Sequence, residues 1–372
     1  MNFDLTEYEE MLKALAERFV SDRYDMERRG AYQAESNGFG AANWALLGEI
    51  GLIAAPVAAE DGGSGLDATA IATVFEALGR GLVVEPLIEN VVLATRLFAA
   101  AAPEPLRSRW LPRLLSGEAR IALAHSEAAG RPGRLWIETQ ASAGPEPARL
   151  NGAKAYVPAG GGVDGYIVSA RQSGAPGEAG GVGLFLVRAD AKGLACESWR
   201  MADGSVAVSL TLDDVAAEPG FSPADGVARI EAADTLASLA RSAEALGIME
   251  RMFAETQDYL RTREQFGVKL GSFQALQHRM VTQYAAIEQS RALMNLAIVS
   301  WGTGSFDRAV VGLRAFVAPA SVALGHEMIQ FHGGMGVTDE LSIGHAHKRL
   351  LVLSRWPDEP EAALDRFAGI AA

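Results

Sequence analysis

The residues best suited to bind a flat, anionic group lie in one stretch, RTREQFGVKLGSFQALQHR, at positions 261–279. Arg263 offers a planar donor fork that suits a diphosphate, and Phe266 offers a ring that packs on the edge of a planar group. Gln274 both donates and accepts hydrogen bonds. A surface turn needs only Gly267, so the other residue types indicate ligand binding.

A second stretch, FHGGMGVTDE at 331–340, follows a helical pattern and is rich in glycine. Taken alone, it indicates a glycine-capped helix end. Beside the arginine stretch it gains a second meaning, because the backbone of Gly333 and Gly334 lets a ligand approach closely. Gln330 adds a polar side chain next to them.

A carboxylate that removes a proton near neutral pH must be shielded from water, because burial raises its pKa. Glu244 lies in ARSAEALG, an otherwise small and apolar sequence, and is the candidate base. The alternative for Glu244 is an ion pair with Arg241 on the same helix or a helix–helix contact. Asp358 and Glu359, flanked by prolines, are the remaining candidates and are predicted in an exposed turn.

Composition excludes several classes of protein. The chain has 372 residues, a net charge of −13 and 49% hydrophobic residues, so no basic excess favours nucleic acid or an anionic membrane. Its single cysteine, Cys196, forms no intrachain disulfide, and the six histidines lack metal-site spacing. The acidic N-terminal stretch is not a signal peptide, and no long apolar run predicts a transmembrane helix. We therefore expect a cytoplasmic protein without a metal site.

The distribution of proline and glycine, which break helices and form turns, divides the chain into three predicted domains. Residues 1–118 show helical periodicity, with Asp67 as a predicted N-cap. Residues 119–222 contain short β-rich runs at 153–157, 165–170, 182–187 and 206–212 separated by turn signals, which predict a β-barrel or sandwich. Residues 223–372 begin with a proline-free helical stretch to Ala318 and predict a helical bundle, with Pro319 early in a further helix. The fold class is α+β.

These motifs resemble those of the acyl-CoA dehydrogenases, flavoproteins that oxidise the Cα–Cβ bond of acyl-CoA thioesters. The resemblance covers essentially the whole chain, and the domain order matches. Within the family, the sequence is similar in particular to the small subunit of pimeloyl-CoA dehydrogenases and to paired subunits that act on steroid side chains. The residues that carry it are Arg263–Gly267, Phe273-Gln274, Gln330–Gly336, Ser126-Glu127 and the LNGAKAYV strand at 150–157.

The resemblance implies a noncovalent FAD at a subunit interface. Arg263, Phe266 and Gln274 would come from one protomer, and Gln330, Gly333 and Gly334 from its neighbour. Ser126 would meet the flavin ring. A carboxylate would take the α-proton of the thioester while the β-hydrogen leaves as hydride to the flavin.

The sequence departs from the family where the family carries two of its site residues. The family's Trp-x-Thr falls on Tyr156-Val157-Pro158, and proline has neither a hydroxyl nor an N–H. The family's base usually lies where this chain reads LSRWPDEPEA (353–362), or else near Ala237-Ser238, which carries no carboxylate.

Three interpretations follow. The first is an acyl-CoA dehydrogenase, with Glu244 as base, Arg241 lining the substrate site and electron-transfer flavoprotein as acceptor. The second is a flavin oxidase or monooxygenase on the same fold. The third is a partner subunit that completes FAD sites in a heteromer without supplying a base. Homo-oligomer and heteromer both stay open, and the sequence leaves the acyl group undetermined.

Overall fold

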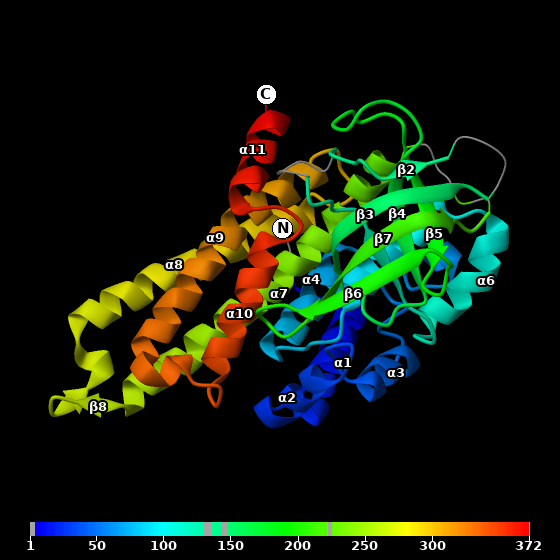
Figure 1. The fold of residues 1–372 in the computed structure, drawn as a ribbon. Helices are drawn as coiled ribbons and strands as arrows, with labels where there is room; N and C mark the ends of the chain where they lie inside the picture. Colours follow the sequence, from blue (N-terminus) through cyan, green and yellow to red (C-terminus); the bar gives the residue numbers. More distant parts are fainter. Residues whose placement is uncertain (1–3, 130–134, 143–146, 220, 222–224, 372) are drawn as a thin grey trace. The chain divides into compact units, whose positions relative to one another are not determined.

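The computed structural model describes residues 4–129, 135–142, 147–219, 221 and 225–371 (Figure 1). Its contacts divide the chain into two compact units, which we describe separately. Unit 1 comprises residues 1–30, 67–83 and 238–372, and unit 2 comprises residues 31–66 and 84–237. Each unit therefore combines segments that are far apart in the sequence.

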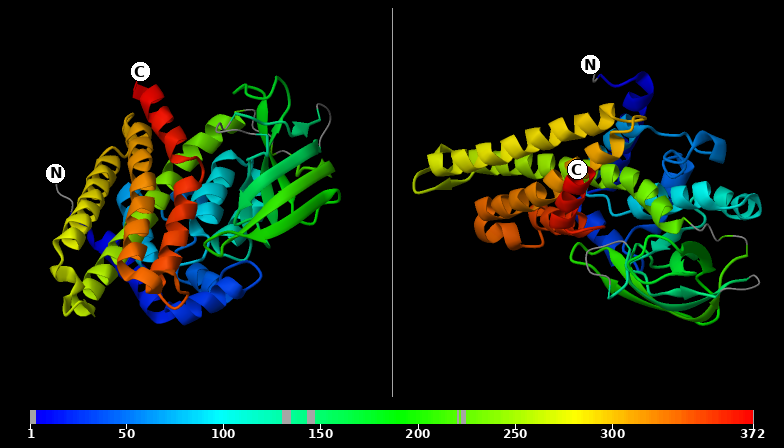
Figure 2. Two further views of the ribbon diagram at one scale, coloured as in Figure 1. Left: turned by 60° about the vertical axis from the view of Figure 1, so that its left-hand side comes forward. Right: turned by 90° about the horizontal axis from the view of Figure 1, so that it is seen from above.

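Unit 1 is helical, and Figure 2 shows its long helices side by side. A short hairpin of β8 and β9 joins α7 to α8, and two 3₁₀ turns, η3 and η4, precede α8 and α10. The elements are α1 (Glu7–Arg23), α4 (Ala68–Arg80), α7 (Gly226–Thr262, in unit 1 from residue 238), β8 (Glu264–Gln265), β9 (Val268–Lys269), η3 (Leu270–Ser272), α8 (Gln274–Val299), α9 (Phe306–His332), η4 (Gly333–Val337), α10 (Ser342–Arg355) and α11 (Pro360–Ala371).

Two glycines let α4 and α7 cross closely. A Cβ on Gly79 would collide with the backbone of Glu244, and a Cβ on Gly247 would collide with the backbone of Glu76. The absence of side chains at both points brings the helix backbones into contact. The Asp67 carboxylate caps α4 by accepting from the Ala70 amide at 2.9 Å, as the sequence predicts.

Helix α9 begins earlier than the sequence predicts, so Pro319 lies inside the helix rather than near its start. The proline is tolerated because it is on an exposed face while Leu313, Val317 and Leu324 bury the opposite one. Residues Phe306–Val337 are long and apolar enough for a membrane span, with 56% of the apolar window buried. Packing against α8, α10 and α11 accounts for that composition.

Unit 2 combines short helices with a seven-stranded sheet. The helices are α2 (Met26–Ala34, which begins in unit 1), α3 (Ala41–Glu49), η1 (Ala59–Asp61), the π-helix η2 (Leu87–Thr95), α5 (Arg96–Ala101) and α6 (Glu104–Leu115). The strands are β1 (Ile121–Ala124), β2 (Gln140–Ala141), β3 (Arg149–Pro158), β4 (Gly165–Arg171), β5 (Val182–Arg188), β6 (Leu194–Arg200) and β7 (Val206–Ala216).

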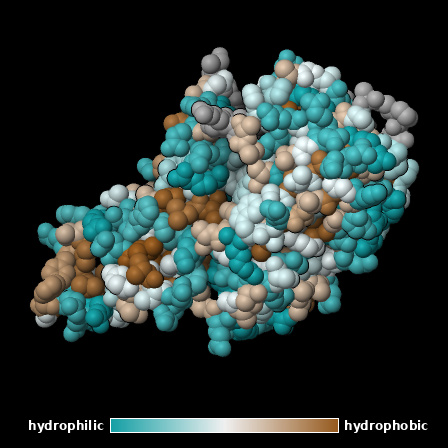
Figure 3. All heavy atoms as spheres, in the orientation of Figure 1, coloured by the Kyte–Doolittle hydropathy of each residue, from teal (hydrophilic) through white to brown (hydrophobic). Residues whose placement is uncertain are grey.

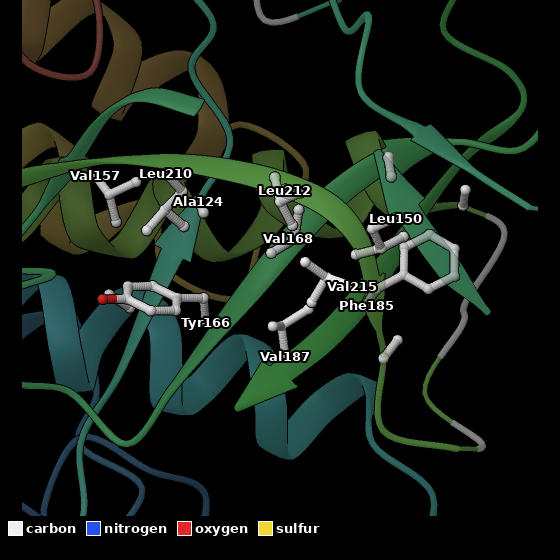
Figure 4. Packing of buried hydrophobic residues seen from close by; sticks show 14 of the residues in the cluster. Ala124, Leu150, Val157, Tyr166, Val168, Phe185, Val187, Leu210, Leu212 and Val215 are labelled. Carbon is white, nitrogen blue, oxygen red and sulfur yellow. The ribbon is translucent and has the colours of Figure 1, made fainter. Parts of the chain in front are cut away.

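The sheet runs in the order β1-β4-β2-β3-β7-β6, with β5 also paired to β4. Alternate residues of β3, β4, β5 and β7 fill one core, in which Leu150, Val168 and Phe185 are at most 1% exposed (Figure 4). All four predicted strands are confirmed. The sequence missed β1, β2 and β6; β6 is exposed at nearly every residue, so it shows no alternation of apolar side chains.

The α+β fold class is confirmed, with helices first, strands next and a helical bundle last. The three domain ranges 1–118, 119–222 and 223–372 stay a prediction, because the contacts group the same elements into two units by a different criterion.

Candidate functional site

The arginine stretch forms the hairpin at one end of the bundle. Helix α7 ends at Thr262, β8 and β9 pair through Gln265 and Val268, and α8 begins at Gln274. Phe266 and Gly267 are the two central residues of the turn, and both have positive φ, 55° and 78°. Two-residue hairpin loops favour this geometry, and glycine adopts it freely.

Phe266 is unusual because a bulky side chain rarely occupies the left-handed region. Its side chain is 91% exposed and contacts Phe273 edge-on, with ring centroids 6.4 Å apart. Figure 3 shows apolar atoms at this end of the bundle, where Val268 is also exposed. Phe266 is thus strained and almost fully exposed for a single edge-on ring contact with Phe273, which favours a role in contacting another molecule.

The glycine turn lies at the same end of unit 1. His332, the last residue of α9, stacks on Tyr259 of α7 with centroids 4.4 Å apart and hydrogen-bonds to the Met328 carbonyl. These contacts fix the start of η4, so Gly333 and Gly334 follow directly. Two features that are about 70 residues apart in sequence thus share one end of the bundle, as expected from antiparallel helices.

The residue types at this end fit a cofactor such as FAD. Gly334 has an ordinary backbone conformation, and a Cβ there would meet no atom within 4 Å, so the chain's own packing does not require glycine. Arg263, Gln274 and Gln330 are exposed, and none of the three side chains bonds to another described residue. An open glycine, an arginine fork and two amides at one end of the bundle suit a diphosphate-bearing ligand.

Glu244 lies on α7 and is 5% exposed, so the prediction of a dry environment holds. Its partner is Arg349 of α10: Nε donates to Oε1 at 2.6 Å and Nη2 donates to Oε2 at 2.9 Å. The suggested ion pair with Arg241 is therefore wrong, because the guanidinium that reaches the carboxylate comes from another helix. Arg241 is buried, with 1% exposed.

The two remaining candidate carboxylates are also held by arginines. Arg366 Nη1 donates to Asp358 Oδ2 at 2.7 Å, and Arg355 pairs with Glu359. The Asp358 side chain is 10% exposed, so the predicted exposed turn is wrong for Asp358 but correct for Glu359. Burial of Asp358 follows from Arg314, which donates to the carbonyls of the turn, including that of Asp358 at 3.2 Å.

A cavity of about 650 Å³ lies between α1, α4 and α8, and none of the candidate site residues above lines it. Its floor carries Glu76, Arg80 and Arg291, which form a closed charge network with Glu250. Burial raises the pKa of Glu76 although Arg291 opposes that shift. Each arginine is neutralised by two glutamates, so the network serves to hold three helices together.

In unit 2, Ser126 follows β1 and pairs with Tyr156 of β3 as an isolated antiparallel bridge. In the sequence, Glu127 and the strand containing Lys154 are recognisable only as parts of family motifs, not as partners. The structure joins them: Lys154 Nζ lies 2.6 Å from Glu127 Oε1, and both side chains are at most 5% exposed. The signal in the sequence was a lysine at an inward position of a strand, where lysine is seldom found.

With this geometry in place, comparison with known proteins identifies the class. Residues 6–118 match the family model "Acyl-CoA dehydrogenase, N-terminal domain", and residues 225–356 match "Acyl-CoA dehydrogenase, C-terminal domain". The chain therefore belongs to the acyl-CoA dehydrogenase family, whose members are oxidoreductases acting on acyl-CoA.

Among its relatives is the acyl-CoA dehydrogenase IpdE2 of Mycobacterium tuberculosis, 29% identical over 368 residues, covering 97% of this chain and 96% of the relative. A solved variant of the Tcur3481–Tcur3483 steroid ACAD is 28% identical, with a TM-score of 0.85 and coverage of 98% and 99%. The ChsE4–ChsE5 complex from Mycobacterium tuberculosis is 25% identical, with a TM-score of 0.87 and coverage of 100% and 99%. The names of both solved structures join two different proteins, Tcur3481 with Tcur3483 and ChsE4 with ChsE5.

Proposed function

We propose that this chain is one subunit of a heteromeric, FAD-dependent acyl-CoA dehydrogenase that converts an acyl-CoA thioester to the 2-enoyl-CoA. In this proposal the chain supplies residues for FAD, and a second acyl-CoA dehydrogenase chain supplies the base. The residues proposed to bind FAD are Ser126, Arg263, Phe266, Gln274, Gln330, Gly333 and Gly334.

One observation supports assigning the base to the second chain: arginines bind all three candidate carboxylates of this chain. A carboxylate oxygen that a guanidinium holds by a hydrogen bond must leave that pair before it can take a proton from a substrate. Glu244 is the strongest case, because both of its oxygens accept hydrogen bonds from Arg349. The family's other usual position for the base falls near Ala237-Ser238, which carries no carboxylate in this chain.

The residues at the bundle end have distinct roles in the proposal. When bound, FAD supplies the hydride acceptor that the α,β-oxidation of a thioester requires. Arg263 neutralises a diphosphate by paired hydrogen bonds, and Phe266 packs against a ring of the cofactor. Gln274 and Gln330 donate to its polar edges, and Gly334 leaves room for close approach.

A second candidate is a chain that catalyses alone with Glu244 as base and Arg241 lining the substrate site. The burial of Glu244 favours it, because a carboxylate away from water becomes a competent base once its ion pair opens. A substrate anion that binds Arg349 would open the pair. The same fold would also serve an oxidase or monooxygenase. Turnover measured with and without oxygen distinguishes these two activities from a dehydrogenase.

The partners follow from the same assignment. The pairing in the Tcur3481–Tcur3483 and ChsE4–ChsE5 structures supports a heteromer, and a homo-oligomer is the alternative. Exposed apolar residues of α8, among them Val281, Tyr284 and Leu296, offer a surface for association. We propose a soluble, cytoplasmic protein that passes electrons to electron-transfer flavoprotein. Neither nucleic acid nor a membrane is expected as a partner.

Purification tests this proposal. The chain, expressed with a second acyl-CoA dehydrogenase chain from the same source, should co-purify with it and carry flavin that denaturation releases as FAD. A colourless preparation that takes up no added FAD, alone or with that chain, would refute the cofactor assignment. A monomer in light scattering at micromolar concentration would refute the association.

A further inference from the structure

The segment that carries Ser126 is held against β3 by the backbone. The amide of Ala155 donates to the carbonyl of Ser126 at 2.9 Å, and Ser126 pairs with Tyr156. Neighbouring side chains in an extended segment point to opposite faces. His125 and Glu127 therefore share the inner face of the sheet, while Ser126 lies on the other.

Lys154 binds the residues on both sides of Ser126. Its Nζ donates to the His125 carbonyl at 3.2 Å, to Glu127 Oε1 at 2.6 Å and to Ser169 Oγ at 3.0 Å. Ser169 Oγ in turn lies 2.9 Å from His125 Nδ1. The lysine side chain is completely buried, and these three partners use all three of its N–H donors.

Glu127 is anchored from its other side as well. Its carboxylate accepts from the Glu138 amide at 2.6 Å, the Thr139 amide at 3.1 Å and the Thr139 hydroxyl at 2.6 Å. The pair between Lys154 and Glu127 is thus fully hydrogen-bonded. Burying such a pair gives little net stability compared with apolar residues of the same volume, so stability alone is a weak reason for a lysine at this position.

The strand itself is irregular at this point. The register of β3 against β7 shifts between Lys154 and Val157, which brackets Tyr156. A bulge of this kind changes the direction in which a side chain points and commonly lies beside a functional site. The inward lysine and the outward Tyr156 are two residues apart on the same irregular segment.

From this arrangement we infer that Lys154 is a positioning residue: by binding His125 and Glu127 it holds Ser126 and Tyr156 in the orientation that meets the cofactor. This inference rests on the proposed function, in which Ser126 lies at the flavin ring. Lys154 acts through its neighbours and needs no contact with cofactor or substrate.

The charge of the pair provides a readout that a purely structural role does not. Burial lowers the pKa of Lys154 to about 8, and the charge of Glu127 opposes that shift. Above that pH the amine is neutral, and in the proposed function the Glu127 charge then lies uncompensated in the residue next to the flavin-facing Ser126. Among the described residues, Lys154 also faces the Ser169 hydroxyl and, through it, the His125 ring. Arg171, further along β4, donates to backbone carbonyls.

The first experiment needs no cofactor. Amide exchange is measured by NMR in the FAD-free protein for wild type, Lys154→Met and the exposed control Lys192→Met. If Lys154 positions the segment, the Ala155 and Thr139 amides exchange at least about 10-fold faster in Lys154→Met, with the amides of β5 unchanged. Unchanged exchange at Ala155 and Thr139 would overturn the inference.

The second experiment uses FAD itself. Lys154→Met should weaken FAD binding by about 10-fold, the size expected when a supporting shell is lost. The midpoint potential of the bound flavin should lose a pH-dependent step near pH 8 that wild type and Lys192→Met both show. Equal affinity and an unchanged pH profile in Lys154→Met would contradict the inference.

A variant that fails to fold and a wild type that binds no FAD each leave a measurement that decides the inference. If Lys154→Met does not fold, Ser169→Ala removes the hydroxyl that joins Lys154 to His125 and should speed Ala155 exchange in the same direction; no change there would count against the inference. If wild type binds no FAD, the proposed function fails, while the exchange rates still decide whether Lys154 positions Ser126.

Discussion

Arg349 of α10 holds both carboxylate oxygens of Glu244 on α7, at 2.6 Å and 2.9 Å, in a pair that crosses the bundle. Glu244 is buried, whereas the arginine side chain is 23% exposed. The pair therefore fixes α10 against α7 and occupies both carboxylate oxygens of Glu244. Whether Glu244 acts as a base depends on whether this pair opens.

The strength of the pair is measurable. Removing either partner alone, in Glu244→Gln or Arg349→Met, should reduce the free energy of unfolding by about 2–4 kcal/mol, because a buried group loses its partner. The double variant should lose less than the sum of the singles, with a coupling of at least about 1 kcal/mol in urea unfolding. Strict additivity would show that the pair is open in solution.

Gly334 provides a test that separates ligand binding from folding. Its backbone conformation suits any residue, and a Cβ there meets nothing in the chain. Gly334→Ala should therefore leave the melting temperature within about 2 °C of wild type but weaken FAD binding by about 10-fold or more, because a methyl group fills the approach to the cofactor.

Gly304 is the matched control for Gly334, since it too is open and lies in a turn without predicted FAD residues. Gly304→Ala should change neither the melting temperature nor the affinity measured by flavin fluorescence. If Gly334→Ala binds FAD as wild type does, the cofactor lies elsewhere.

Phe266 should show opposite effects on stability and binding. Phe266→Asn places Asn-Gly in a turn whose central residues both have positive φ, the preferred pair for this geometry. The variant should melt no lower than wild type, because the phenylalanine contributes only an edge contact with Phe273. Its FAD affinity, by fluorescence titration, should fall by about 10-fold through loss of ring packing. A large drop in melting temperature would mean that Phe266 serves the fold.

Sequence alone predicted the secondary-structure elements better than the contacts between side chains of different elements. The strands of the central region and the break at Gly267 followed from local rules of alternation and turn formation, which depend on neighbours in the chain. Glu244 was correctly predicted to be buried, but Arg349, 105 positions away, was not predicted to bind it. The choice between Arg241 and Arg349 depends on how α10 packs on α7, which no local pattern specifies.

The same limit applies to Asp358 and to Lys154. Flanking prolines predicted an exposed turn at Asp358, but Arg314 draws that turn inward through its carbonyls. Lys154 lies in a strand that was predicted from its residue pattern, yet its hydrogen-bond partners Glu127 and Ser169 come from other segments. The cofactor residues remain a prediction from motif resemblance, which carries information on assembly that a single chain's periodicity lacks.

Acid should weaken unit 2 through Glu127. Burial tends to raise the pKa of this carboxyl, but the charge and hydrogen bonds of Lys154 and Thr139 outweigh it and lower the pKa below 4.5. A carboxyl with a lowered pKa in the folded state stabilises the protein above about pH 4.5, and this stabilisation is lost as pH falls through the folded-state pKa. Urea unfolding between about pH 5 and pH 3 should therefore show a steeper loss in wild type than in Glu127→Gln. Parallel curves would contradict the shift.

The most direct test of the central claim is anaerobic flavin reduction by CoA thioesters, followed by the visible absorbance of the flavin. The FAD-loaded chain is measured alone and with its co-purified partner chain, using straight, branched, dicarboxylic and steroid-side-chain thioesters. We expect no reduction by the chain alone, reduction in the heteromer, and less than about a 3-fold change when the heteromer carries Glu244→Gln. Reduction by the chain alone, slowed by about 100-fold or more in Glu244→Gln, would show that Glu244 is the base and contradict the division of labour.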